Sequence, residues 1–199
     1  MKSALFSIKP KYCELIARGK KTVEVRKTRP KIPTPFKGYV YETKSLYRGS
    51  GNCLFQGQGK VIGEFICDEI NLITQVSNMM SNKADYRAVS ADGTLLSDDI
   101  FNLAQLTKKE VSDYLEGRNG YALHISDLVI YDKPKELSEF IVHSKIGCVN
   151  EGKCQGCQYF DFGNGYNIEA DCNAPFCTDE YKPLKRPPQS WCYVEELNK

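Results

Sequence analysis

Lys21, Glu24 and Arg26 bring three charged side chains together within one short segment of alternating polarity. On an extended strand, Glu24 and Arg26 would leave the same face about 7 Å apart, with Lys21 at the strand entrance. An arginine there can bind a phosphate or a base edge through two parallel hydrogen bonds, and a carboxylate can accept from an exocyclic amine. The same side chains could instead form a surface ion pair worth less than about 1 kcal/mol. The segment alone leaves both interpretations open.

Basic and aromatic residues elsewhere in the chain would complete a nucleic-acid site. Lysines neutralise backbone phosphate, and aromatic rings stack on unpaired bases. The predicted contacts are Lys9, Lys20, Lys21, Arg26, Lys27 and Trp191. Tyr12 and Tyr121 are alternatives for stacking, because a lone tryptophan at the start of a strand is often a core residue.

The distribution of charge along the chain favours a polyanion as the partner. Residues 1–48 hold 13 lysines and arginines against 3 acids, whereas the whole chain has a net charge of only +2. The rest of the chain is therefore acidic overall. Such a split is typical of a protein with a basic face for nucleic acid, although lysine-rich loops can also serve solubility alone.

Five cysteines follow one another late in the chain, at positions 148, 154, 157, 172 and 177. Two residues separate Cys154 from Cys157, a spacing that lets two thiolates bind one ion, and the whole pattern is close to ribbon-like zinc spacings. The segment has few large aliphatic residues, so a metal would supply the stability that burial cannot. The predicted ligands of a structural Zn²⁺ are Cys154, Cys157, Cys172 and Cys177, with Cys148 or His143 as alternatives for one of them. An iron–sulfur cluster, an oxidised pair and unliganded thiols also remain open.

Short strands and few helices are predicted to position these residues. Alternating and apolar runs predict the strands, and a capping-box pattern at residues 107–110 predicts a helix start. The predicted strands cover residues 4–8, 22–26, 38–43, 61–67, 121–131 and 191–194, and the predicted helices 10–18, 98–106 and 107–115. A mobile loop is expected over residues 49–59, and residues 68–106 show little pattern beyond their short helix. This content predicts an α+β domain built on a curled sheet or barrel.

The opening of the chain resembles that of an ASCH domain, a member of the PUA-like superfamily. The resemblance rests on Leu5-Phe6-Ser7-Ile8-Lys9-Pro10, a helix, and then Gly19-Lys20-Lys21-Thr22-Val23-Glu24-Val25-Arg26 on the next strand. Residues 107–134 are also similar to the family, and the ending Pro187-Pro188-Gln189-Ser190-Trp191 is similar to its phage and bacterial members. The resemblance implies a PUA-like curled β-barrel with flanking helices and a cleft beside the first helix. Its implied partner is RNA, another single-stranded nucleic acid, or a modified nucleoside.

One group of relatives resembles an amidohydrolase of N4-acetylcytidine, with the motif Lys-Thr-x-Thr-x-Arg. Lys21, Thr22 and Arg26 match this motif, but Glu24 stands in place of the second threonine, the nucleophile of that group. The resemblance therefore favours binding over catalysis. If the cleft is catalytic, the resemblance implies Lys21 as the base beside Glu24, with water or Thr22 as the nucleophile.

The cysteine-rich segment divides the chain into three parts. We expect an ASCH/PUA-like domain over residues 1–141, a zinc-binding insertion over 142–180, and a closing strand of the first domain within 181–199. No run approaches the roughly 20 apolar residues of a membrane-spanning helix, and the N-terminus lacks a signal-peptide core. We therefore expect a cytoplasmic protein without a membrane partner. A protein-interaction adaptor that docks through the cysteine segment is a third interpretation.

Overall fold

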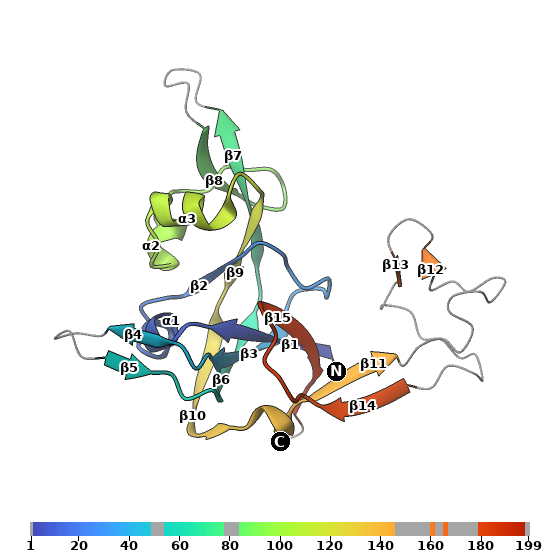
Figure 1. The fold of residues 1–199 in the computed structure, drawn as a ribbon. Helices are drawn as coiled ribbons and strands as arrows, with labels where there is room; N and C mark the ends of the chain where they lie inside the picture. The colour runs from blue at the N-terminus through green and yellow to red at the C-terminus, as the bar shows by residue number, and fades with distance from the viewer. Residues whose placement is uncertain are drawn as a thin grey trace.

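Two sheets and three α-helices make up most of the structure, a computed structural model (Figure 1). It describes residues 2–48, 54–77, 84–145, 160–161, 165–166 and 179–197. The larger sheet has five strands in the order β10-β6-β3-β1-β15, and the second has four in the order β2-β9-β7-β8. Together they form a sheet-dominated α+β fold. In the described part of the chain no helix is long and apolar enough to cross a membrane.

Strand β1 of the five-stranded sheet has side chains that enter two different cores in alternation. Ala4, Phe6 and Ile8 belong to one core, and Leu5 packs in the other with Tyr39. β1 is therefore buried at every position from Ser3 to Ile8, as expected of a strand covered on both faces. It pairs in parallel with β3 and antiparallel with β15. The strands are β1 (Lys2–Ile8), β3 (Phe36–Glu42), β6 (Val61–Cys67), β10 (Ser126–Lys135) and β15 (Trp191–Glu195).

The four-stranded sheet carries two helices, which cover its apolar residues. Val111 and Leu115 of α3 and Phe101 of α2 pack with Val23 and Val25 of β2. The helix α3 begins as the sequence predicts, because Thr107 and Glu110 form a reciprocal capping box. The elements are β2 (Val23–Arg26), β7 (Ile70–Ser77), β8 (Ala84–Val89), β9 (Gly120–His124), α2 (Asp99–Leu103) and α3 (Lys108–Leu115).

The helix α1 (Pro10–Ala17) lies between β1 and β2 in the chain, and its Tyr12 lines the cavity described below. Pro10 occupies the first turn, where its missing N–H costs nothing, and Gly19 follows the helix with a φ of 68°. Cys13 and Ile16 are buried against the core. Both ends of α1 therefore agree with the sequence prediction.

Three two-stranded ribbons and a 3₁₀ turn complete the described elements. They are β4 (Leu46–Arg48) with β5 (Leu54–Gln56), β11 (Ile141–Lys145) with β14 (Asp179–Pro183), β12 (Phe160–Asp161) with β13 (Gly165–Tyr166), and η2 (Leu137–Glu139). The register of β11 with β14 pairs Lys145 with Asp179, the described residues on either side of the cysteine-rich segment.

The structure corrects four expectations about the elements. Residues 70–77 and 84–89, which show little pattern in the sequence, pair as strands β7 and β8, because Ile73 and Tyr86 pack with residues of α2 and α3. The predicted strand 121–131 is two strands in different sheets, with Ile125 between them donating its N–H to Thr22 at 2.8 Å. The described strands form open sheets and do not close into a barrel. Strand β5 also lies within the loop predicted for residues 49–59, of which residues 49–53 are outside the described part.

Candidate functional site

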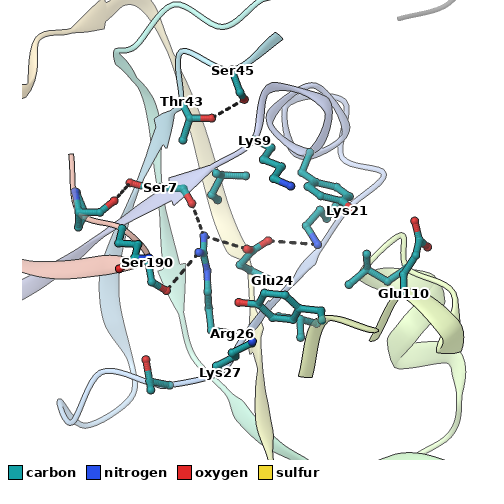
Figure 2. A pocket seen from close by; sticks show the side chains of 18 of the residues that line it. Ser7, Lys9, Lys21, Glu24, Arg26, Lys27, Thr43, Ser45, Glu110 and Ser190 are labelled. Atoms are coloured by element: carbon teal, nitrogen blue, oxygen red, sulfur yellow. Dashed lines mark hydrogen bonds and ion pairs between the residues drawn. The ribbon is translucent and has the colours of Figure 1, made fainter. Parts of the chain in front are cut away.

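A cavity of about 760 Å³ lies where β2, α1, α3 and the segment before β15 meet (Figure 2). Strand β2 positions its floor, because Val23 and Val25 pack under the helices while Glu24 and Arg26 turn to the opposite side. All four residues of β2 are buried. The predicted alternation of this strand is correct, but its polar face is covered and does not lie on the surface. The lining residues are Ser7, Ile8, Lys9, Tyr12, Lys21, Glu24, Val25, Arg26, Lys27, Thr28, Thr43, Ser45, Leu106, Glu110, Asp113, Tyr114, Pro187, Pro188, Gln189 and Ser190.

Lys21 is 2% exposed, and its ammonium group has three protein acceptors. Nζ donates to the carbonyl oxygens of Val23 at 2.8 Å and Ala104 at 2.7 Å, and it lies 3.2 Å from Oε2 of Glu24. The Tyr12 ring lies 5.2 Å away. Since an ammonium has three donors, these contacts use them all and tie the start of β2 to the end of α2. Burial lowers the pKa of Lys21 below its ordinary value, and the charge of Glu24 offsets part of that decrease.

Glu24 joins the two cations of the floor. Its Oε2 faces Lys21, and its Oε1 lies 3.1 Å from Nη2 of Arg26. Each carboxylate oxygen therefore has one cationic partner, and Glu24 itself is only 8% exposed. A carboxylate buried to this extent needs such partners, because an unpaired buried charge is strongly unfavourable.

Arg26 connects the floor to the segment that precedes β15. Its Nη2 donates to the carbonyl oxygen of Ser7 at 2.7 Å, and Nη1 lies 3.4 Å from the hydroxyl of Ser190. The guanidinium also lies 5.8 Å from the centre of the Phe6 ring. Ser7 holds the same segment through a 2.6 Å hydrogen bond from its hydroxyl to the carbonyl of Pro188. The dashed lines of Figure 2 follow this chain of contacts from Ser190 through Arg26 and Glu24 to Lys21.

Exposed basic groups lie around this buried floor. Lys9 is exposed, and Lys27 is half-buried, with its ammonium 2.7 Å from Glu116 and 5.2 Å from the centre of the Tyr114 ring. Two acids of α3, Glu110 and Asp113, also line the cavity. The lining therefore has mixed charge, with exposed or half-buried lysines at the edge and buried, paired cations at the bottom.

Two rim groups have shifted pKa values with clear causes. Hydrogen bonds from the backbone and hydroxyl of Thr107 lower the pKa of Glu110. Burial raises the pKa of Tyr12, and the charges of Glu110 and Glu24 raise it further. Tyr12 thus stays a neutral phenol whose ring faces Lys21.

The structure brings together five of the predicted site residues and leaves two apart. Lys9, Lys21, Glu24, Arg26 and Lys27 line the cavity. Lys20 is exposed but is not among the described residues that line it. Trp191 is also outside the lining, since it packs against the main core and donates from Nε1 to the hydroxyl of Thr28 at 3.0 Å.

Sequence reasoning missed the contribution of α3 to the site. Tyr114 and Glu110 come from this helix, about 90 residues after β2 in the chain. The spacing of Glu110 and Tyr114 by four places them on one helix face, but only the tertiary fold directs that face to the cavity. Ser190 belongs to the ending motif quoted above, and this motif was the available signal for the opposite wall.

The five clustered cysteines lie outside the described residues. Within the described residues, no group of histidine, cysteine or acidic side chains is arranged to hold a metal ion. Cys13 and Cys67 are buried thiols, and Cys192 is half-buried. Burial raises the pKa of Cys67 to about 12 and that of Cys192 to about 11, so neither is a thiolate at neutral pH.

These observations define a sheet-dominated α+β protein with a polar cavity beside its first helix. The model of the ASCH domain family matches residues 6–112, more than half of the chain. The chain belongs to the ASCH domain family.

Solved structures give a weaker likeness. The crystal structure of ASCH from Zymomonas mobilis is 21% identical, with 68% of this chain and 73% of that chain covered and a TM-score of 0.45. A mutant of the same Zymomonas mobilis protein is 22% identical, with 69% and 77% covered and a TM-score of 0.41. None of the curated proteins compared with this chain matches it.

Proposed function

We propose that this ASCH domain protein binds single-stranded RNA by taking one unpaired or modified nucleotide into the cavity. The observation that carries the proposal is the construction of the cavity, in which a fixed polar floor is surrounded by lysines and tyrosines. Its volume of about 760 Å³ is within the range of small-molecule sites. A nucleotide can use the polar groups, the tyrosines and the lysines of such a cavity. Its base has polar edges that form hydrogen bonds, the ring of the base stacks on aromatic side chains, and its phosphate is anionic.

Each part of a nucleotide has a chemically suitable partner in the lining. Tyr114 is 38% exposed, so its ring is available to stack on a base. Lys9 and Lys27 line the cavity and can contact the phosphate. The hydroxyl and amide groups of Thr28, Gln189 and Ser190 can hydrogen-bond a base edge.

The buried floor has a supporting role in this proposal. The three N–H groups of the Lys21 ammonium all face protein acceptors, so Lys21 does not contact phosphate in this proposal. Arg26 and Glu24 fix the position of the cavity walls. A floor whose side chains are held by one another keeps the cavity open without a ligand, which lowers the entropic cost of binding.

A salt-dependent binding measurement tests the proposal. Fluorescence anisotropy of a labelled single-stranded oligoribonucleotide should show an affinity that falls with salt, and Lys9→Ala should reduce the logarithmic salt slope by about 0.7. Lys133→Ala is the matched control, because Lys133 is exposed on β10 and does not line the cavity. An oligodeoxynucleotide and free N4-acetylcytidine distinguish RNA from DNA and from a modified nucleoside. Undetectable binding of all of them at low salt would refute the proposal.

The proposal includes a structural Zn²⁺ held by Cys154, Cys157, Cys172 and Cys177. Its support is their spacing, together with the β11–β14 ribbon, which pairs Lys145 with Asp179 on either side of the cysteine-rich segment. Thiolate ligands require a reducing compartment, so we place the protein in the cytoplasm. Elemental analysis of protein purified without added metal should find one zinc per chain, and Cys154→Ser with Cys157→Ser should lose it. Metal-free protein that remains folded would contradict this part.

An amidohydrolase is a less well supported alternative. In its favour, burial lowers the pKa of Lys21 in a cavity that also contains Glu24. Against it, a base must hold a free lone pair, whereas Lys21 has three acceptors that each need one of its protons. Binding therefore remains the main proposal.

A further inference from the structure

A second cavity of about 490 Å³ adjoins the first one. Thr43 and Pro187 line both cavities, so the two cavities lie side by side at these residues. The second cavity lies beside η2 and the segment that follows β14. Its lining residues are Tyr41, Thr43, Lys44, Gly59, Glu136, Leu137, Ser138, Leu184, Lys185 and Pro187.

The boundary between the cavities is rigid on both sides. On one side, Thr43 donates its N–H to Ile8 at 2.9 Å, and its hydroxyl lies 2.9 Å from that of Ser45. Gly57 packs so closely on this turn that any Cβ there would clash with the carbonyl oxygen of Thr43. On the other side, Ser7 fixes the segment after Pro187 through its backbone and hydroxyl hydrogen bonds. Both sides of the boundary are therefore held in place by contacts within the described fold.

The second cavity is positively charged. Lys44 and Lys185 are both exposed, and neither takes part in an ion pair with any residue that the structure describes. Glu136, the acid in the lining, is neutralised by Lys60 at 2.8 Å. The aliphatic stem of Lys44 lies against Gly59, whose φ of +71° and missing side chain leave room for it. This packing directs the lysine along the cavity wall while its ammonium stays in water.

We propose that the site binds a continuous single strand of RNA, which passes from the first cavity between Thr43 and Pro187 into the second. Lys44 and Lys185 contact the phosphates of the nucleotides next to the one held in the first cavity. The inference rests on the proposed function and makes it more specific, because the preferred ligand is then a polynucleotide and not a free nucleotide. The second cavity has few aromatic side chains in its lining, so its contribution is electrostatic and independent of sequence.

Comparing one nucleotide with a strand separates this inference from the proposed function. Labelled oligouridylates are measured by fluorescence anisotropy, and uridine 5′-monophosphate by equilibrium dialysis, with wild type and with Lys44→Ala/Lys185→Ala. The double variant should bind the oligouridylate at least about fivefold more weakly and lower its salt slope by about 1.4, since each lost phosphate contact removes about 0.7. Its affinity for the mononucleotide should not change. Lys2→Ala/Lys133→Ala is the control of equal charge, because both lysines are exposed and outside both cavities.

Each outcome tests either the second cavity as an RNA path or the proposed function of the first cavity. Oligouridylates that bind no tighter than the mononucleotide, or an equal loss in the Lys2/Lys133 control, overturn the second cavity as an RNA path and leave the first cavity intact. Equal weakening of the mononucleotide by Lys44→Ala/Lys185→Ala also overturns it, because the two lysines would then act at the first cavity. Failure of both ligands to bind wild type overturns the proposed function itself.

Discussion

The floor and the rim of the first cavity use the same kinds of charged residue for different purposes. On the floor, Lys21, Glu24 and Arg26 are at most 8% exposed and bind one another and the backbone. At the rim, Lys9 is exposed, and Glu110 caps its own helix within reach of solvent. A charged motif in the sequence can therefore be structural, while the residues that contact a ligand lie beside it at the rim of the cavity.

Replacing the floor carboxylate should have the largest effect on stability. Glu24→Gln leaves Lys21 and Arg26 as two buried cations without a counter-charge, and we expect a loss of about 3–5 kcal/mol in the free energy of unfolding. Chemical denaturation followed by circular dichroism measures it. The matched control is Glu110→Gln, which removes a carboxylate from the rim of the same cavity and should cost less than about 1 kcal/mol. Equal losses in the two variants would abolish the distinction between floor and rim.

Removing the exposed aromatic ring of the rim should have a smaller effect, and on binding alone. Tyr114→Ala should weaken RNA binding by about 1–3 kcal/mol, the usual range for stacking on a single base. Tyr114→Phe keeps the ring and should bind like wild type, so the pair distinguishes stacking from hydrogen bonding by the hydroxyl. Anisotropy titrations measure both variants, and unchanged affinity of Tyr114→Ala would remove Tyr114 from the site.

Local signals in the sequence were sufficient for several elements. Pro10 and Gly19 delimit α1, the Thr107–Glu110 pair starts α3, and the apolar run Val61–Cys67 is β6 with the predicted bounds. Each of these depends on residues a few positions apart. The backbone there has the same preference in any fold, so the sequence alone is informative.

The burial of Glu24 and Arg26 depends on distant parts of the chain, and for that reason the sequence did not show it. Their strand alternates like a half-exposed one, but Ser7 of β1 and the segment at Ser190 contact Arg26 on its polar side. The split of residues 121–131 at Ile125 has the same origin, because the two halves pair with different strands, β2 and β6. Trp191 packs against the core for a related reason, since β15 closes the sheet beside β1.

The pH dependence of stability should show a small contribution from the rim. The folded-state pKa of Glu110 is lowered from 4.5, so its ionised form stabilises the fold fully above pH 4.5, and this stabilisation is lost as the pH falls through the lower, folded value. The difference in unfolding free energy between wild type and Glu110→Gln should therefore shrink below pH 4.5, from a value under about 1 kcal/mol. Thr107→Ala removes one of the responsible hydrogen bonds and should reduce this pH effect. A difference that grows on acidification would contradict the capping-box origin of the shift.

The smallest effect expected is on catalysis, where we predict no release of acetate from N4-acetylcytidine. To act as a base, Lys21 would have to lose a proton, yet Val23, Ala104 and Glu24 each accept from its ammonium. Burial lowers the pKa of Lys21, which favours the neutral amine, but the adjacent carboxylate of Glu24 favours the charged form. Glu24 also occupies the place of the threonine that serves as nucleophile in the amidohydrolase motif. Incubation of protein with the nucleoside, followed by chromatographic separation of cytidine, measures turnover directly. Turnover that disappears in a folded Lys21→Met variant would show that Lys21 of the floor is a catalytic residue, and the floor would then no longer be purely structural.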